Sequence, residues 1–287
     1  MRWEGRRQST NVEDRRGQRL RRGGAISGVG LLAVVVLGLF FGVDPRVLLT
    51  GVQVVNTVAP TVSEQGPYEE APAEAERREF ISVVLADTED VWRALFQSLG
   101  GQYREPRLVL FSGAVDSGCG FAQAAMGPFY CPPDERVFLD LSFFDELAGR
   151  MGAGGDFAQA YVLAHEVGHH VQNLLGTSDQ VQQMRQRVGE AQSNELSVRL
   201  ELQADCYAGV WAHHAERMQQ ILEAGDVDEA LGAASAVGDD RLQRQAQGYV
   251  VPDSFTHGTS EQRMQWFRAG FDSGDLAACD TFSHRGA

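Results

Sequence analysis

The sequence predicts an α+β domain that is mostly helical with a small sheet and follows one N-terminal hydrophobic helix. Helical periodicity of apolar residues begins at residue 77 and dominates the chain after residue 156. Two short runs rich in Val, Leu and Phe, at 107–113 and 136–141, are typical of β-strands. Residues 25–43 carry no charge, and these 19 residues span about 28 Å as a helix, which is enough to cross a bilayer.

Residues 1–24 form an arginine-rich tail, in which eight Arg outnumber three acidic residues. Such a tail in front of residues 25–43 predicts a single transmembrane helix with the N-terminus in the cytoplasm. No small-residue cleavage site follows the hydrophobic run, which favours an uncleaved anchor over a signal peptide; a buried core helix is the other alternative. We therefore expect a single-pass membrane protein whose remaining chain is extracytoplasmic, in the periplasm or at the cell surface.

Residues 44–76 are rich in Pro, Glu and Ala without apolar periodicity, so we predict a linker that leads to one folded domain at 77–287. The chain beyond residue 24 carries 17 basic and 36 acidic residues, within a total net charge of −14. A domain this acidic is unsuited to binding the phosphates of nucleic acid, so no nucleic-acid partner is expected.

Within this domain the elements follow in order. A helix over 77–100 comes first, and the two strands then flank a Gly- and Pro-rich segment. Ser142 is predicted to cap a short helix, and Asp156 to cap a long helix that ends at Gly176. The rest of the domain is predicted to be largely helical, in three segments at 195–225, 226–245 and 259–270.

Four cysteines fit an oxidising compartment, where an even number is commonly fully paired. Cys119 and Cys131 lie close in sequence and are predicted to staple one loop, which leaves Cys206 to pair with Cys279. A zinc site is the alternative, although the chain has no CxxC spacing, and the sequence leaves all three connectivities open.

The pentapeptide HEVGH lies in the middle of the long helix, within YVLAHEVGHHVQNLLG. His165 and His169 are four residues apart and therefore project from one face, where both can bind one zinc ion. Glu166 lies beside the water that such an ion holds and can take its proton. His170 points about 100° away from His169, so we predict a packing role for it. The alternative is two exposed histidines on an ordinary helix.

A third zinc ligand is available in the helical segment ELQAD. Glu201 and Asp205 are four residues apart, so they share a helix face. We predict that Glu201 binds the metal and that Asp205 hydrogen-bonds to the outer nitrogen of a zinc-binding histidine. The alternative is that both are solvated acids on a helix surface.

Several segments together resemble one family: HEVGHHVQNLLG, SGCGFAQAAMGPFYCP, VFLDLSFFDEL, RLELQADCYAGVW, GDDRLQ and DSFTHGTSEQRMQWF. The chain is similar along nearly its whole length to the bacterial membrane-anchored proteins described as neutral zinc metallopeptidases. The resemblance implies a zincin-like fold, with one zinc ion on His165, His169 and Glu201, Glu166 as the base and Asp205 behind a ligand. The HExxH and ExxxD arrangement is similar to that of the glutamate-ligand zincins, including the CAAX prenyl proteases.

A late histidine is a further catalytic candidate. His257, in FTHGTSEQR, resembles the THP-x-x-x-ER segment of the CAAX protease group, with Gly258 in place of proline. The resemblance implies a donor to the oxyanion that forms during peptide hydrolysis; the alternative is a capping or packing residue. Tyr249 is a weaker candidate for the same role, and His213 and His214 are expected to be ordinary helix residues.

Together these expectations describe a membrane-anchored zinc metalloendopeptidase that acts on a peptide or protein substrate. The strand at 136–141 could bind such a substrate by strand addition. Two alternatives stay open: a zinc amidase that acts on cell-wall peptides, and a zinc-containing binding or assembly protein without catalytic turnover.

Overall fold

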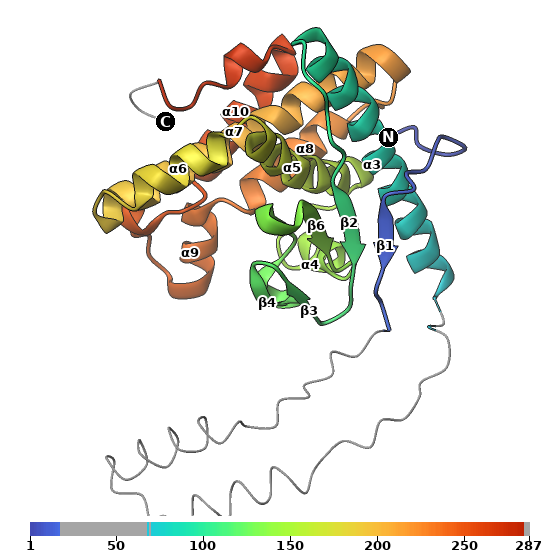
Figure 1. The fold of residues 1–287 in the computed structure, drawn as a ribbon. Coiled ribbons are helices and arrows are strands. Elements are labelled where there is room, and N and C mark those ends of the chain that lie inside the picture. Colours follow the sequence, from blue (N-terminus) through green and yellow to red (C-terminus); the bar gives the residue numbers. More distant parts are fainter. Residues whose placement is uncertain (18–67, 69, 284–287) are drawn as a thin grey trace, which may run out of the picture. The chain divides into compact units, whose positions relative to one another are not determined.

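The computed structural model describes residues 1–17, 68 and 70–283 (Figure 1). Two long helices, α5 (Asp156–Leu174) and α7 (Glu190–Gln219), form the centre of the helical part, as Figure 1 shows. α5 is buried along most of its length, because apolar residues lie on all sides of it. Helix α8 (Asp226–Ala236) packs against α5, and α10 (Ser260–Ser273) packs along α7.

The contact between α7 and α10 depends on close backbone approach. A Cβ atom on Gly270 would lie 2.0 Å from the carbonyl oxygen of Cys206, which is closer than any side chain allows. The glycine therefore brings α10 against the middle of α7, near Asp205. The remaining helices are α3 (Pro72–Ser98), α4 (Phe143–Gly149), α6 (Thr177–Arg185) and α9 (Asp239–Gln247).

A four-stranded sheet lies beside α5 and α3, with the strand order β1-β2-β6-β5. Its strands are β1 (Val12–Asp14), β2 (Arg107–Leu110), β6 (Arg136–Leu139) and β5 (Phe129–Cys131). β2 is parallel to β1 and to β6, whereas β5 is antiparallel to β6. A separate hairpin, β3 (Ala114–Ser117) and β4 (Gly120–Gln123), fills the segment between β2 and β5. This architecture confirms a mostly helical α+β chain with a small sheet.

The predicted disulfides are both present. Cys119 pairs with Cys131 across the hairpin segment, and Cys206 pairs with Cys279 across 73 positions of sequence. The long-range pair ties α7 to the short helix Leu276–Cys279 that follows α10.

The predicted boundary between an N-terminal tail and the domain is wrong for the described residues. Residues 1–17 belong to the same compact unit as residues 70–283, and β1 is the outer strand of its sheet. The predicted linker also ends earlier than expected, because α3 begins at Pro72, a residue that suits the first turn of a helix. The predicted transmembrane segment 25–43 lies outside the described residues. None of the helices that the structure describes combines the length and apolar character needed to cross a bilayer.

Two predicted helix caps differ in detail. Ser142 occupies the N-cap position of α4, but its hydroxyl donates to Asp140 and does not cap the helix. Asp156 lies in the first turn of α5 after Gly155, and its carboxylate accepts hydrogen bonds from the ammonium group of Met1.

Candidate metal centre

Two helices bring the predicted metal ligands together. α5 carries His165 and His169 on one face, and α7 carries Glu201 opposite them. The helices approach each other at Gly168, where a Cβ atom would lie 2.9 Å from the carbonyl oxygen of Ala204. A larger residue would force the helices apart, so the glycine inside HEVGH sets the spacing between the histidines and the glutamate.

Ligand atoms of three side chains converge on one point. Nε2 of His165 lies 3.1 Å from Nε2 of His169 and 3.1 Å from one carboxylate oxygen of Glu201. Nε2 of His169 lies 3.4 Å from the other oxygen of Glu201. Tetrahedral zinc with bonds of about 2.0–2.1 Å places its ligand atoms about 3.3 Å apart. The three side chains therefore fit three corners around one zinc ion.

The charges around these atoms favour a cation. Burial alone would lower the pKa of His165, but Asp205 and Glu201 raise it to about 10. The pKa of His169 is likewise raised against its burial by Glu201, and the two histidines hold the pKa of the buried Glu201 well below its usual range. The site thus retains positive charge, which is supplied by protons or by a metal ion that displaces them.

The outer nitrogen of His165 is held by a buried carboxylate. Nδ1 of His165 donates to Asp205 over 2.8 Å, so Nε2 is the nitrogen that faces the metal position and would bind the ion once its proton is displaced. Asp205 also accepts from Nε of Arg263 at 2.8 Å, from Nη2 of Arg263 at 2.9 Å and from the hydroxyl of Tyr161. The arginine is itself 3% exposed, so the carboxylate remains charged in a dry environment.

The outer nitrogen of His169 is held by an amide. Nδ1 of His169 lies 2.9 Å from Oε1 of Gln172, and the amide nitrogen of Gln172 donates to the carbonyl oxygen of Leu200 at 2.6 Å. The second bond fixes the orientation of the amide, so Oε1 accepts from His169. Both histidines are therefore held with Nε2 toward Glu201.

A cavity of about 1080 Å³ opens in front of these atoms. The three ligand residues line it, together with Glu166 and His257. Glu166, the residue after His165, is buried, with 8% of its surface exposed. A cavity of this size holds several residues of an extended peptide. The structure thus brings the predicted base and the late histidine to the same cavity as the metal ligands.

His257 is held by Asp239, the first residue of α9. Nδ1 of His257 lies 3.2 Å from one carboxylate oxygen, and the backbone N–H groups of Thr256, His257 and Gly258 donate to the other. The hydrogen bond that His257 donates to Asp239 raises the pKa of His257 above its usual value. Tyr249 is 62% exposed and does not line the cavity, so the structure does not bring it to the site.

The remaining histidines of the described chain form hydrogen bonds between structural elements. His170 is buried; Nε2 donates to the carbonyl oxygen of Arg104 at 2.6 Å, so Nδ1 accepts from the hydroxyl of Tyr130 at 2.9 Å. His213 and His214 lie 2.7 Å and 2.8 Å from carbonyl oxygens of Phe271 and Gly274, at the end of α10. These contacts agree with the packing roles expected from the sequence.

A second acidic cluster, Asp156, Asp226 and Glu229, lies at the start of α5. The ammonium group of Met1 lies 2.8 Å from Asp156 and 3.3 Å from Asp226. Burial would lower the pKa of this ammonium, but its hydrogen bonds to Asp156 and Glu223 raise it to about 10. The cluster therefore already contains a cation, and it is not the better candidate for a metal.

Sequence reasoning missed three residues of the site. Tyr161 lies four positions before His165 and Gln172 three positions after His169, so helical spacing alone places both near the ligands. Arg263 gives no such signal, because it lies 58 positions after Asp205 on a different helix. Only the packing of α10 on α7 brings it to the carboxylate.

The site therefore has two histidines on one helix, a glutamate from a second helix and an adjacent acidic residue at a large cavity. This is the residue set that a zinc-hydrolase centre uses, which makes the site a candidate metal centre of that class. The chain belongs to the family described as "Putative neutral zinc metallopeptidase", whose model matches residues 1–282. This confirms the resemblance inferred from the sequence.

Bacterial relatives share most of the chain. It is 52% identical over 291 residues to YpfJ of Escherichia coli K12, covering 98% of this chain and 99% of that protein. It is 45% identical over 219 residues to Rv2575 of Mycobacterium tuberculosis and to Mb2605 of Mycobacterium bovis, covering 73% of each chain. The names of these relatives state no activity. No solved structure matches the fold, so the zincin-like fold stays a prediction.

Proposed function

We propose that this protein is a zinc-dependent endopeptidase that uses one zinc ion held by His165, His169 and Glu201. The observation that carries the proposal is the convergence of three side chains, whose nearest ligand atoms are 3.1–3.4 Å apart, at the wall of a cavity large enough for a peptide. Membership of a family described as zinc metallopeptidases supports it.

Each side chain has a role in this chemistry. When bound, zinc lowers the pKa of a coordinated water and polarises the carbonyl of the substrate. Glu166 takes the proton of the attacking water and passes it to the leaving amine. His257 donates from Nε2 to the oxyanion, because its Nδ1 faces Asp239. Asp205 and Gln172 keep the two ligand imidazoles in the required orientation.

The substrate strand predicted at 136–141 is corrected by the sheet order. β6 has β2 on one side and β5 on the other, so both of its edges are occupied. β5 is the outer strand on that side of the described sheet, and its residues Phe129 and Tyr130 line the cavity. We therefore propose that an extended peptide pairs with the outer edge of β5.

The walls of the cavity indicate which peptides fit. Apolar side chains from several elements line it: Met126, Phe129, Phe143, Met151, Val162 and Leu242. Burying an apolar substrate side chain against such a wall is favourable by about 25 cal/mol per Å². We expect cleavage next to large apolar residues.

Cleavage of an unbiased peptide library by the full-length, zinc-loaded protein tests the proposal, with new termini identified by mass spectrometry. The wild-type protein should cleave peptides, and Glu166→Gln should lower the rate by about 10²–10⁴-fold while retaining one zinc per chain. If both proteins hold one zinc and neither cleaves any peptide, the protein binds zinc without catalysis. Cleavage confined to cell-wall peptides would instead identify an amidase.

A further inference from the structure

We propose that residues 1–17 and 70–283 form one folded unit in the cell and therefore lie on the same side of any membrane that the chain contacts. The inference does not depend on the proposed peptidase activity. It concerns the arginine-rich segment that the sequence alone assigns to the opposite side from the domain.

Backbone pairing ties this segment to the sheet and to α3. β1 pairs in parallel with β2, in register from Val12 with Leu108 to Asp14 with Leu110. Just before this strand, the N–H of Ser9 donates to the carbonyl oxygen of Ser82 in α3 at 2.9 Å. Without residues 1–17, β2 would lose its neighbour on that side and expose its backbone groups.

Apolar packing adds to the pairing. Met1 is 6% exposed and belongs to the main hydrophobic core. The ring of Trp3 packs edge-on against Phe80 of α3, with ring centroids 5.5 Å apart. Residues 1–17 therefore contribute buried side chains to the hydrophobic core of the domain.

The arginines of the segment form ion pairs with buried acids of the domain. Arg6 pairs with Asp87 at 2.7 Å and Arg7 with Glu89 at 2.9 Å, and the two carboxylates are 4% and 3% exposed. If the segment lay across a membrane, both acids would lose these partners. Removing the arginine from the ion pair of Arg6 and Asp87, in which the carboxylate is buried, is destabilising. These arginines are therefore occupied within the unit and cannot also serve as the cytoplasmic signal that the sequence suggests.

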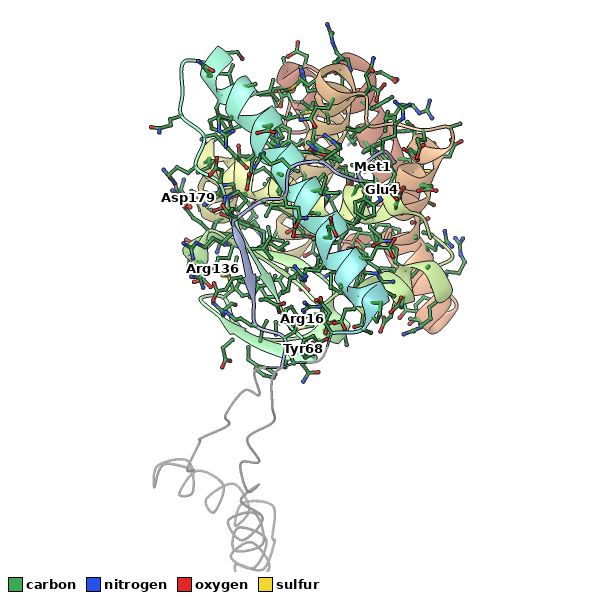
Figure 2. The ribbon with its side chains drawn as sticks, turned by 90° about the vertical axis from the view of Figure 1, so that its right-hand side faces the viewer. Met1, Glu4, Arg16, Tyr68, Arg136 and Asp179 are labelled. Atoms are coloured by element: carbon green, nitrogen blue, oxygen red, sulfur yellow. A yellow bond between two sulfur atoms is a disulfide. The ribbon has the colours of Figure 1, made fainter. Side chains whose placement is uncertain are left out.

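Arg16 joins the end of the N-terminal segment to the start of the next described segment, which begins at residue 70. Its guanidinium is 1% exposed and bonds to Glu70 at 2.6 Å and to Glu74 at 2.9 Å. Figure 2 shows Arg16 at one end of the domain. Because Arg16 is paired with Glu70, the described chain stops at residue 17 and resumes at residue 70 in the same place. One crossing by residues 25–43 would separate the two ends, so the unit does not fit a single-pass arrangement.

Cysteine labelling in bacterial cells that express the full-length protein tests the shared side. Glu4 and Gln97 are exposed, and the four native cysteines are paired, so Glu4→Cys and Gln97→Cys each add one reactive thiol. A membrane-impermeant maleimide is applied to intact spheroplasts and to lysed ones, with the wild-type protein as control. Both variants should react before lysis, or both only after it. Reaction of one variant before lysis and of the other only after it would overturn the proposal and restore the single-pass orientation.

A cross-link tests the docking itself. The amide nitrogen of Gln8 lies 3.1 Å from a carboxylate oxygen of Glu79. In the full-length Gln8→Cys/Glu79→Cys variant, with a protease site inserted between residues 44 and 67, a short bismaleimide should keep the two fragments joined after cleavage. The control is Gln8→Cys/Gln97→Cys, because position 97 lies 18 residues further along α3, about 27 Å away. Equal cross-linking of both pairs, or of neither, would contradict the docking.

Discussion

Nδ1 of His165 donates to Asp205 over 2.8 Å, on the side of the imidazole that faces away from His169 and Glu201. This hydrogen bond keeps the proton on Nδ1 of His165, the proposed metal ligand, and leaves Nε2 for the ion. Replacing Asp205 with Asn should therefore lower the affinity for zinc by about 10–100-fold, the usual effect of losing such a partner. Competition with a chromophoric zinc chelator measures this affinity.

The matched control for this change is Asp228→Asn, at an exposed position on α8. Asp205→Asn also leaves Arg263 without its charged partner, so the variant should unfold at lower temperature. Calorimetry on the zinc-free protein separates this loss of stability from the loss of zinc affinity. Unchanged zinc affinity in the folded variant would refute the role of Asp205.

Glu201 is the proposed zinc ligand on α7. Glu201→Ala removes the carboxylate that lies 3.1 Å from His165 and 3.4 Å from His169, so zinc content after dialysis should fall well below one ion per chain. Glu195→Ala, six residues earlier on the same helix and more exposed, should retain one ion. Elemental analysis of both variants gives the answer, and equal zinc content would remove Glu201 from the site.

Tyr130 connects β5 to the helix that carries the ligands. Its hydroxyl donates to Nδ1 of His170 at 2.9 Å and accepts from Asn173 at 3.1 Å. Tyr130→Phe leaves the buried imidazole without this partner, at a cost of about 1–3 kcal/mol. If β5 binds the substrate, KM for long peptides should rise more than KM for short ones, while zinc content stays at one per chain. An equal rise for both lengths would contradict substrate pairing along β5.

The pair of His257 and Asp239 gives a pH dependence with a definite sign. The hydrogen bond that His257 donates to Asp239 raises the pKa of His257 above 6.5. Its contribution to stability is therefore present below pH 6.5 and is lost as pH rises through the raised value. Burial would raise the pKa of Asp239, but hydrogen bonds from His257 and the backbone hold it below 3.8. Its contribution is present above pH 3.8 and is lost as pH falls through the lowered value.

Asp239→Asn should therefore move the pKa of His257 down toward 6.5, as measured by NMR titration of its ring protons. The difference in unfolding free energy between the wild-type protein and the variant should be largest between about pH 4 and 6.5 and should shrink on both sides. An unshifted titration of His257 would show that Asp239 does not hold this side chain in solution.

The grouping of the candidate metal ligands could be predicted from the sequence because helical spacing is local. His165 and His169, like Glu201 and Asp205, are four residues apart, and each pair shares a helix face wherever that helix packs. Helical spacing could not identify Arg263, because it lies on a different helix from Asp205. The packing of α10 on α7, with Gly270 against Cys206, determines which residues of the two helices meet.

The N-terminal strand was misjudged for a related reason. Its arginines precede an uncharged run, and local rules for membrane proteins interpret that pattern as a cytoplasmic tail. The structure instead pairs Val12 with Leu108, almost a hundred positions away, and places Arg6 on the buried Asp87. Long-range strand pairing leaves no periodic trace in one sequence, so the sheet order and the correct edge strand also had to come from the structure.

Anomalous diffraction at the zinc edge, from crystals of the full-length protein grown with zinc, tests the central claim most directly. We predict one peak about 2.0–2.1 Å from Nε2 of His165 and of His169 and within bonding distance of Glu201. No peak at these three side chains, or a peak at Asp156 and Asp226 instead, would contradict the metal centre on which the proposed function depends.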